Sequence, residues 1–172
     1  MIKRIKKCSD DSKADFIVVE IGGTVGEYQN EIFYMAGRNM KTKGEKVFFV
    51  HVGYLPVPKS LGEMKTKPVQ QSVEQLCRMG IQPDMIVFRS DYPIDDERRE
   101  KIETFCNVGR DYVISNPDLK NIYELPLIFE QQNLGNKILK NFDPALSEWN
   151  NMVNNKFDRI WDCGNSKWIY TK

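Results

Sequence analysis

The first residue whose type and place could do chemistry is Glu20, which separates an apolar run from a glycine-rich turn. The run Phe16 to Val19 is apolar throughout and β-branched at three of its four positions, which predicts a strand covered on both faces of a parallel sheet. In open α/β sheets, ligands bind beyond the carboxyl ends of the strands, where a carboxylate can hold a hard cation and its phosphates. Glu20 is therefore a candidate Mg²⁺ ligand. The alternative is a solvated Glu that begins a tight strand-to-helix turn.

The turn that follows has the pattern Gly-Gly-x-x-Gly, formed by Gly22, Gly23 and Gly26. Glycines leave no side chain in the turn, so backbone N–H groups can approach an anionic or planar ligand. The pattern is neither the dinucleotide fingerprint nor a phosphate loop that ends in Gly-Lys-Ser/Thr. By itself it indicates a ligand-binding turn without specifying the ligand.

A second candidate is the loop from Gly62 to Gln70, in which Lys65 and Lys67 flank a threonine. Pro68 is suited to the first turn of a helix. The free N–H groups of a helix start, together with two ammonium groups, could bind phosphate. A surface turn with exposed lysines is the alternative.

A third candidate is Arg89-Ser90-Asp91, which follows the apolar run Met85 to Phe88. This run predicts a buried strand, so the three polar residues should lie at the ligand-binding edge of the sheet. Residues 112–114 predict another short strand, which is followed by Ser-Asn-Pro-Asp ending at Asp118.

The predicted elements that position these candidates are strands alternating with helices, an order that predicts a doubly wound parallel sheet. The strands are expected at 16–19, 47–52, 85–88 and 112–114, and the helices at 2–13, 30–40, 69–79, 95–105 and 144–154, with short helices over 123–143 divided by Pro126 and Gly135. His51 in the second strand is expected to be a hydrogen-bonded core residue rather than a catalyst. Residues 155–172 show no clear period.

Composition predicts a single globular domain, because 172 residues are too few for two domains of ordinary size. The formal net charge of +1 gives no global basic field, which argues against nucleic acid and anionic membranes as partners. The four cysteines are widely spaced, which argues against a zinc site or a disulfide framework and suits the cytoplasm. No apolar run approaches the length of a membrane span.

Several runs taken together resemble the synthetase (amidoligase) domain of cytidine triphosphate (CTP) synthases. They occur in the family's order and with similar spacing over residues 1–153. The runs are Glu-Ile-Gly-Gly-Thr-Val-Gly at 20–26, Gly-Glu-Met-Lys-Thr-Lys-Pro at 62–68, Gly-Ile-Gln-Pro-Asp at 80–84, Arg-Ser-Asp at 89–91, Phe-Cys-Asn-Val at 105–108 and Ser-Glu-Trp at 147–149.

The resemblance implies an α/β fold of the P-loop-NTPase-like (Rossmann-like) type, a mostly parallel sheet with helices on both faces. It also implies a reaction in which ATP and Mg²⁺ phosphorylate the 4-oxygen of UTP before ammonia displaces the phosphate to give CTP. Glu20 matches a magnesium ligand of the family, and Arg89 and Asp118 match positions beside the ATP adenine. The positions that match the UTP and CTP site are Gly22, Gly23, Thr24, Glu27, Gln29, Lys65, Lys67, Gln70 and Lys101.

The sequence also departs from the family pattern. The family's phosphate loop and second magnesium-binding Asp have no match here, so the chain is expected to be the C-terminal portion of an N-terminally truncated domain. The glutaminase domain and its Cys-His-Glu triad have no match either. Residues 154–172 form a tail without a predicted role, and Met35 and Gln71 replace a Glu and a His that are common in the family.

These observations leave three hypotheses open. In the first, the chain is a partial CTP synthase, inactive alone, that works as a homo-oligomer or with a complementing chain that carries the phosphate loop. In the second, it is a non-catalytic module that binds pyrimidine nucleotide or joins other subunits. In the third, it is a gene fragment that does not fold alone.

Overall fold

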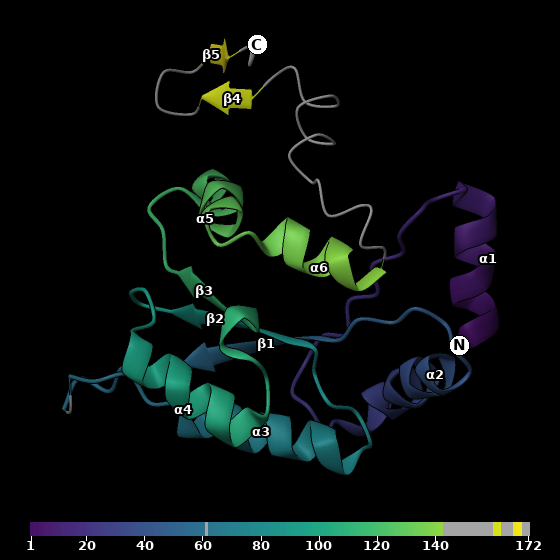
Figure 1. Cartoon of the computed structure of the whole chain (residues 1–172), viewed down its shortest axis with the longest axis horizontal. Helices are drawn as coiled ribbons and strands as arrows, with labels where there is room; N and C mark the ends of the chain where they lie inside the picture. The colour runs from purple at the N-terminus through teal and green to yellow at the C-terminus, as the bar shows by residue number, and fades with distance from the viewer. Residues whose placement is uncertain (61, 143–159, 163–166, 170–172) are drawn as a thin grey trace.

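The computed structural model describes residues 1–60, 62–142, 160–162 and 167–169. Its central feature is a parallel sheet of three strands, β1 (Val50–Leu55), β2 (Met85–Ser90) and β3 (Val113–Pro117), in the order β1-β2-β3 (Figure 1). The register places Val52 beside Val87, and Val87 beside Ile114. The central strand β2 is the most apolar of the three, with its first four residues buried, as expected for a strand covered on both faces.

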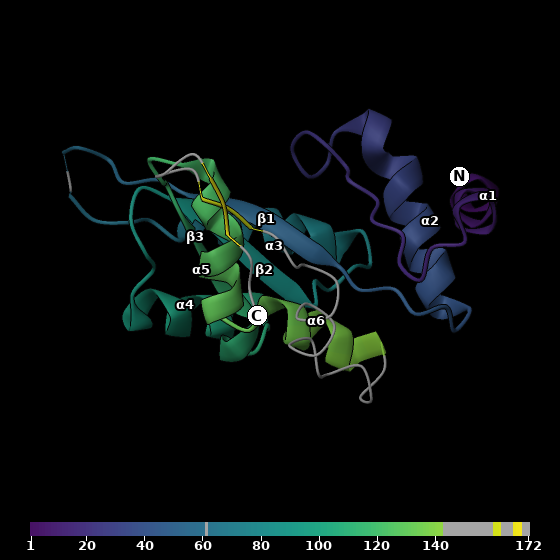
Figure 2. The ribbon, with the colours of Figure 1, turned by 90° about the horizontal axis from the view of Figure 1, so that it is seen from above.

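Helices cover both faces of this sheet, as Figures 1 and 2 show. On one face lie α3 (Lys67–Arg78) and α4 (Asp96–Cys106), and on the other α5 (Leu125–Gln131) and α6 (Leu134–Phe142). The first face holds the larger core, in which Val69 and Ile102 pack with Phe88. The architecture confirms the predicted α/β fold of the Rossmann-like, P-loop type.

The sequence explains where α3 and α4 begin and end. In α3, Pro68 stands in the first turn, Val69, Val73 and Leu76 form one buried face, and Gly80 follows the helix with φ +79°. In α4, the side chain of Asp95 caps the helix by accepting a hydrogen bond of 2.9 Å from the backbone N–H of Arg98. Both helices begin at the carboxyl edge of the sheet because each follows the end of a strand.

The N-terminal part contains α1 (Ile2–Ser12), the short helix η1 (Tyr28–Asn30) and α2 (Glu31–Thr42), with α1 and α2 side by side (Figure 2). Tyr34 of α2 packs with Leu76 and Ile81, so α2 rests against the end of α3 rather than on a face of the sheet. The predicted helices over 2–13 and 30–40 are confirmed.

The predicted strand over 16–19 is wrong, because the structure assigns no strand there. Val18 is 92% exposed, and Phe16 packs edge-to-face on Phe142 with ring centroids 5.3 Å apart. A strand needs a neighbour to complete its hydrogen-bond ladder, and β1 pairs with β2 alone in the three-stranded sheet. A cavity of about 890 Å³ lies beside this segment, between α1, α2 and residues 44–49.

The second predicted strand, 47–52, is shifted by three residues to Val50–Leu55. Just before this start, the Asp84 side chain accepts a 2.7 Å hydrogen bond from the Phe49 backbone N–H, and the Asp84 backbone N–H donates to the Phe49 carbonyl at 2.8 Å. Phe49 is thereby bonded to the loop before β2, and the regular ladder starts one residue later.

The short helices expected over 123–143 are present as η3 (Ile122–Glu124), α5 and α6. The chain breaks between them at other residues than the expected Pro126 and Gly135. Pro126 lies in the first turn of α5, and Gly135 lies inside α6. The break falls at Asn133, which has a left-handed φ of +55°. Asparagine tolerates this conformation better than most residues, so it can reverse the chain there.

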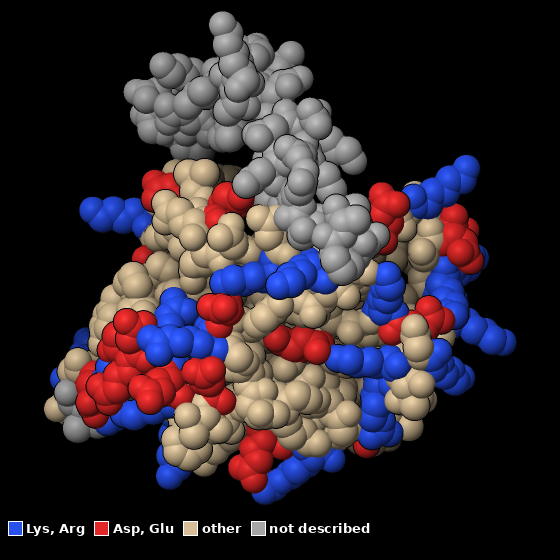
Figure 3. All heavy atoms as spheres, in the orientation of Figure 1, with Lys and Arg blue, Asp and Glu red and all other residues tan. Residues whose placement is uncertain are grey.

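The predicted helix over 144–154 lies outside the described residues. In the tail, β4 (Ile160–Asp162) and β5 (Lys167–Ile169) form an antiparallel pair. No helix in the described part of the chain is long and apolar enough to cross a membrane. Basic and acidic side chains are interspersed over the face seen in Figure 3, in keeping with the net charge of +1.

Candidate functional site

The carboxyl edge of the sheet brings together half of the twelve predicted site residues: Lys65, Lys67, Gln70, Arg89, Lys101 and Asp118. The three strands end in register at Leu55, Ser90 and Pro117. The loop that leaves β1 carries Lys65 and leads into α3, and the segment that leaves β2 leads into α4, which carries Lys101. This is the edge at which open α/β sheets bind ligands.

The loop between β1 and α3, residues 56–66, is fixed at several points. The backbone N–H of Lys65 donates to the carbonyl of Pro56 at 2.9 Å, and the N–H of Gly62 donates to Pro58 at 2.9 Å. Thr66 is buried, and its hydroxyl accepts a 3.1 Å hydrogen bond from the side chain of Gln70. The predicted residues Lys65 and Gln70 therefore flank the start of α3, where unpaired N–H groups favour an anion.

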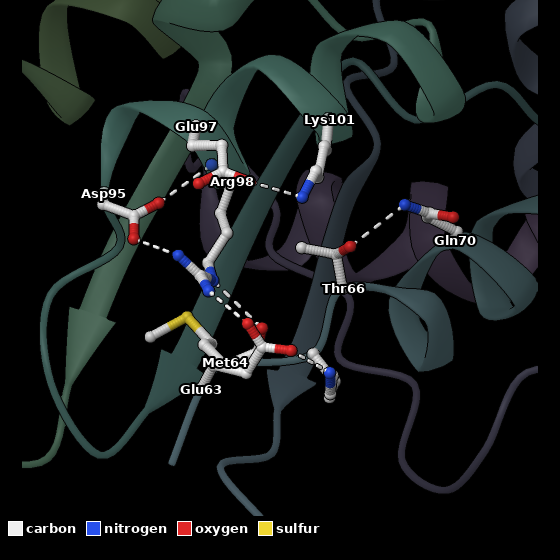
Figure 4. A network of polar contacts seen from close by, with 9 residues as sticks. Glu63, Met64, Thr66, Gln70, Asp95, Glu97, Arg98 and Lys101 are labelled. Atoms are coloured by element: carbon white, nitrogen blue, oxygen red, sulfur yellow. Dashed lines mark hydrogen bonds and ion pairs between the residues drawn. The ribbon is translucent and has the colours of Figure 1, made fainter. Parts of the chain in front are cut away.

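Arg98 of α4 takes part in this loop and was not among the residues predicted from the sequence. Its Nε atom donates to the carbonyl of Met64 at 3.0 Å, and its guanidinium forms ion pairs with Asp95 and with Glu63, the latter at 3.6 Å (Figure 4). The Arg98 side chain is only 14% exposed. Glu63 and Arg98 lie far apart in the sequence, and no local pattern connects them.

Glu63 lies where several cationic side chains converge. Its carboxylate is paired with the ammonium group of Lys65. The hydrogen bond and charge of Lys65, followed by the charges of Arg98 and Lys101, lower the pKa of Glu63 below its usual value. Lys101 itself pairs with Glu97 one turn earlier on α4, with Nζ and Oε1 2.6 Å apart (Figure 4). Three cationic side chains, Lys65, Arg98 and Lys101, are thus paired with three carboxylates at this edge: Glu63, Asp95 and Glu97.

Lys67, the first residue of α3, is exposed. Together with Lys65 and Lys101 it places three lysines near the helix starts at this edge. Anions are favoured at such positions by the helix dipole and by the free N–H groups. The arrangement is suited to bind the phosphate groups of a ligand.

Arg89 and Asp118, each predicted to lie beside the ATP adenine, are in contact with one another at the ends of β2 and β3. The Nε atom of Arg89 lies 3.1 Å from Oδ1 of Asp118. The backbone N–H of Asp118 also donates to the carbonyl of Ser90 at 2.7 Å, which extends the pairing of the two strands by one residue. Both side chains are more than half exposed, so they remain accessible to a ligand.

The glycine-rich turn is closed by its own side chains. The Glu27 carboxylate accepts hydrogen bonds of 2.7 Å from the Thr24 backbone N–H and from the Gln29 side chain. Gly23 has φ +85°, and a Cβ atom there would lie 2.4 Å from the Glu27 carboxylate. The turn thus requires glycine and brings together five predicted residues: Gly22, Gly23, Thr24, Glu27 and Gln29.

The turn and the lysine loop lie at different ends of α3. A Cβ atom on Gly26 would lie 1.8 Å from the side-chain nitrogen of Gln75, so the turn contacts α3 near Gln75. Lys67 is eight residues earlier, which is about 12 Å along the helix axis. The predicted pyrimidine-nucleotide residues therefore form two separate groups in the structure.

Glu20 is exposed and does not follow a strand, which corrects the position predicted for it. Within the described ranges there is no group of three or more His, Cys, Asp or Glu side chains placed to hold a metal. Mg²⁺, however, is commonly held by one or two carboxylates together with substrate phosphates. The exposed carboxylate of Glu20 has the chemistry of a single ligand of this kind.

His51 is buried in β1, as predicted, but within the described part of the chain its Nε2 atom has no hydrogen-bond partner. Burial lowers the pKa of this imidazole. Burial also raises the pKa of the Cys106 thiol to about 11, with a smaller contribution from Cys77. A thiol of this kind is protonated at neutral pH, so Cys106 is not suited to act as a nucleophile.

Comparison with known proteins gives the family. Residues 1–143 match the family model described as CTP synthase N-terminus. The chain belongs to the CTP synthase family. Because the match is to the family's N-terminal region, the prediction that the chain is the C-terminal portion of the synthetase domain is not supported.

The chain is also similar to individual CTP synthases. The chain is 44% identical to the CTP synthase of Sulfolobus acidocaldarius over 157 residues, covering 88% of this chain and 30% of the relative. It is 45% identical to the CTP synthase of Pyrococcus horikoshii over 158 residues, covering 88% of this chain and 29% of the relative. The chain therefore spans less than one third of the length of these CTP synthases.

Proposed function

We propose that this chain binds UTP and CTP at the lysine-rich carboxyl edge of its sheet and takes part in the ATP-dependent amination of UTP to CTP through a 4-phosphorylated UTP. The observation that supports the proposal is that the loop before α3 and the helices α3 and α4 place Lys65, Lys67 and Lys101 at this edge, where Lys65 pairs with Glu63 and Lys101 with Glu97. An anionic ligand would find two ammonium groups and a helix start together there.

In this proposal the two groups of residues divide the nucleotide between them. Lys65, Lys67 and Lys101 neutralise the triphosphate, and Gln70 orients it from the first turn of α3. The glycine turn, with Thr24, Glu27 and Gln29, contacts the pyrimidine nucleotide through backbone and side-chain groups. The two groups lie at different ends of α3 in one chain, so a homo-oligomer in which a second copy contributes one of them is part of the proposal.

ATP is proposed to bind beside Arg89 and Asp118. Their exposed ion pair can rearrange at a small cost in free energy, because surface ion pairs contribute about 1 kcal/mol or less to stability. Glu20 would hold Mg²⁺ through one carboxylate. When bound, Mg²⁺ neutralises charge on the phosphate oxygens during phosphoryl transfer. The lysines have the complementary role of holding UTP in place, because phosphoryl transfer depends on positioning and charge neutralisation.

Calorimetric titration with UTP and with CTP tests the binding. Wild-type chain is expected to bind, and Lys65→Ala is expected to weaken binding roughly tenfold or more, the effect of losing one hydrogen bond to a charged group. Lys43→Ala is the matched control, because Lys43 is exposed at the end of α2, away from the site. Undetectable binding of both nucleotides by the folded wild-type chain would refute the proposal.

A second assay distinguishes an enzyme component from a non-catalytic binding module. The chain is incubated with ATP, UTP, Mg²⁺ and ammonia, alone and with a polypeptide that carries a phosphate loop of the family, and CTP is measured. The proposal expects CTP only from the mixture. Nucleotide binding without CTP from an associated mixture would favour the non-catalytic module.

A further inference from the structure

Arg98 uses each of its three guanidinium nitrogens for a different partner. Nε donates to the Met64 carbonyl at 3.0 Å, one terminal nitrogen pairs with Asp95, and the other lies 3.6 Å from the Glu63 carboxylate. Asp95 belongs to the cap of α4, whereas Met64 and Glu63 belong to the loop before α3. Arg98 therefore joins the start of α4 to this loop.

Met64, the loop residue that accepts this hydrogen bond, is itself held in place by the core. The Met64 side chain is 3% exposed and belongs to the core formed by Val69, Phe88 and Ile102. Its carbonyl points toward α4, where it accepts the hydrogen bond from Arg98. The side chain and the backbone of Met64 are thus held from two directions, immediately before Lys65.

Glu63 lies between Arg98 and Lys65 and is paired with both. One carboxylate oxygen, Oε2, faces the Arg98 guanidinium, and the other, Oε1, pairs with the Lys65 ammonium group. The Glu63 side chain is 53% exposed, while Arg98 is 14% exposed. The less exposed and more fully bonded residue of the pair is Arg98, so it fixes the carboxylate to which Lys65 is paired.

We propose that Arg98 is a positioning residue that holds the loop at residues 62–66 and thereby places Lys65 for anion binding. A lysine could not replace it, because its single nitrogen on a flexible stem does not offer three donor nitrogens in a fixed planar arrangement. The identity of the anion, the triphosphate of UTP, rests on the proposed function. The role of Arg98 in holding the loop does not depend on the proposed function.

Amide hydrogen exchange tests the holding of the loop without any ligand. The Lys65 amide is a suitable probe because it is hydrogen-bonded to Pro56. Arg98→Met keeps a stem of similar length and removes all three donor nitrogens. It is expected to raise exchange at residues 62–66 at least tenfold, while the amides of β2 remain protected. Arg98→Lys is expected to give the same result to a smaller extent.

The matched control is Arg78→Met, which makes the same substitution at a residue of α3 that is 75% exposed and pairs with Glu74. It should leave exchange at residues 62–66 unchanged. Slow amide exchange in β2 shows that a variant is folded. If Arg98→Met is not folded by this criterion, the exchange measured in Arg98→Lys decides whether the proposal holds. Unchanged exchange at Lys65 in a folded Arg98 variant would overturn the proposal.

A double-mutant cycle tests whether Arg98 acts through Lys65. In the wild-type background, Arg98→Met is expected to weaken UTP binding roughly tenfold. In the Lys65→Ala background it should have little further effect, because the group that Arg98 positions is gone. Equal effects in the two backgrounds would overturn the connection to Lys65. If the wild-type chain does not bind UTP, the proposed function fails, and the exchange experiment alone decides the role of Arg98.

Discussion

The side-chain amide of Gln132 pairs with both backbone groups of Ser115, as the backbone of a neighbouring strand would. Its Oε1 accepts from the Ser115 N–H at 2.8 Å, and its Nε2 donates to the Ser115 carbonyl at 2.8 Å. Two residues earlier on the same edge, Arg99 donates to the carbonyl of Val113. The free edge of β3 is thereby covered by side chains, which satisfies its backbone groups and opposes pairing with other chains.

Gln132→Ala is therefore expected to destabilise the chain by about 1–3 kcal/mol, because two backbone groups of a buried residue lose their partner. Urea unfolding measures the change in free energy. Gln131→Ala is the control, since Gln131 is exposed at the end of the same helix, and its effect should lie within about 0.5 kcal/mol. Equal effects of the two substitutions would contradict the role given to Gln132.

Gly53→Ala is expected to destabilise the chain by about 1–3 kcal/mol through overpacking. The strand β1 approaches α3 so closely that a Cβ atom on Gly53 would lie 2.8 Å from Cγ2 of Val69, a buried core side chain. Thermal or urea unfolding measures the loss. Gly109→Ala is the control, because a Cβ atom on Gly109 would have no neighbour within 4 Å among the described residues.

The same contact predicts a coupling between the two residues. Adding Val69→Ala to Gly53→Ala should destabilise the chain less than the sum of the single substitutions, because the shortened side chain makes room for the new methyl group. If the changes in the free energy of unfolding were strictly additive, the effect of Gly53→Ala would not come from a clash with Val69.

Stability is expected to fall on mild acidification because of His51. Burial lowers its pKa in the folded chain below the ordinary value of 6.5, so between these two values the unfolded chain binds a proton that the folded chain does not. The contribution of neutral His51 is therefore fully present above about pH 6.5 and is lost as the pH falls toward the folded pKa.

Urea unfolding between about pH 7.5 and 5.5 measures this slope. His51 is the only histidine of the chain, and His51→Leu should flatten the slope in this interval, because carboxylates titrate mainly at lower pH. An identical pH dependence in the variant would assign the effect to other groups.

Lys67→Ala is expected to separate stability from binding. Lys67 is exposed at the start of α3, so its removal should change the free energy of unfolding by less than about 0.5 kcal/mol. It should nevertheless weaken UTP binding, and the loss should shrink as NaCl is added, because salt screens the attraction between ammonium and phosphate. Titration of the wild type and the variant at low and high salt measures this difference, and an unchanged affinity at low salt would remove Lys67 from the site.

Much of the fold could be predicted because its signals are local. Val69, Val73 and Leu76 recur on one helical face, and Asp95 precedes a run that is acidic first and basic later, so α3 and α4 follow from the sequence with small errors at their ends. The contacts at the site were less predictable. The placement of Arg89 and Asp118 at one edge follows from two strands that end there, but the contact of Arg98 with Glu63 has no sequence signal.

The sequence by itself determined the α/β class, the approximate bounds of α2, α3 and α4, and the family to which the motifs point. These depend on side-chain type and on short periodicities. Only the tertiary structure decided that residues 16–19 have no strand partner, that Gln132 covers the edge of β3, and that Arg98 holds the loop before Lys65. Each of these depends on which distant groups meet, because a hydrogen bond or an ion pair exists only when folding brings both of its partners within about 3–4 Å.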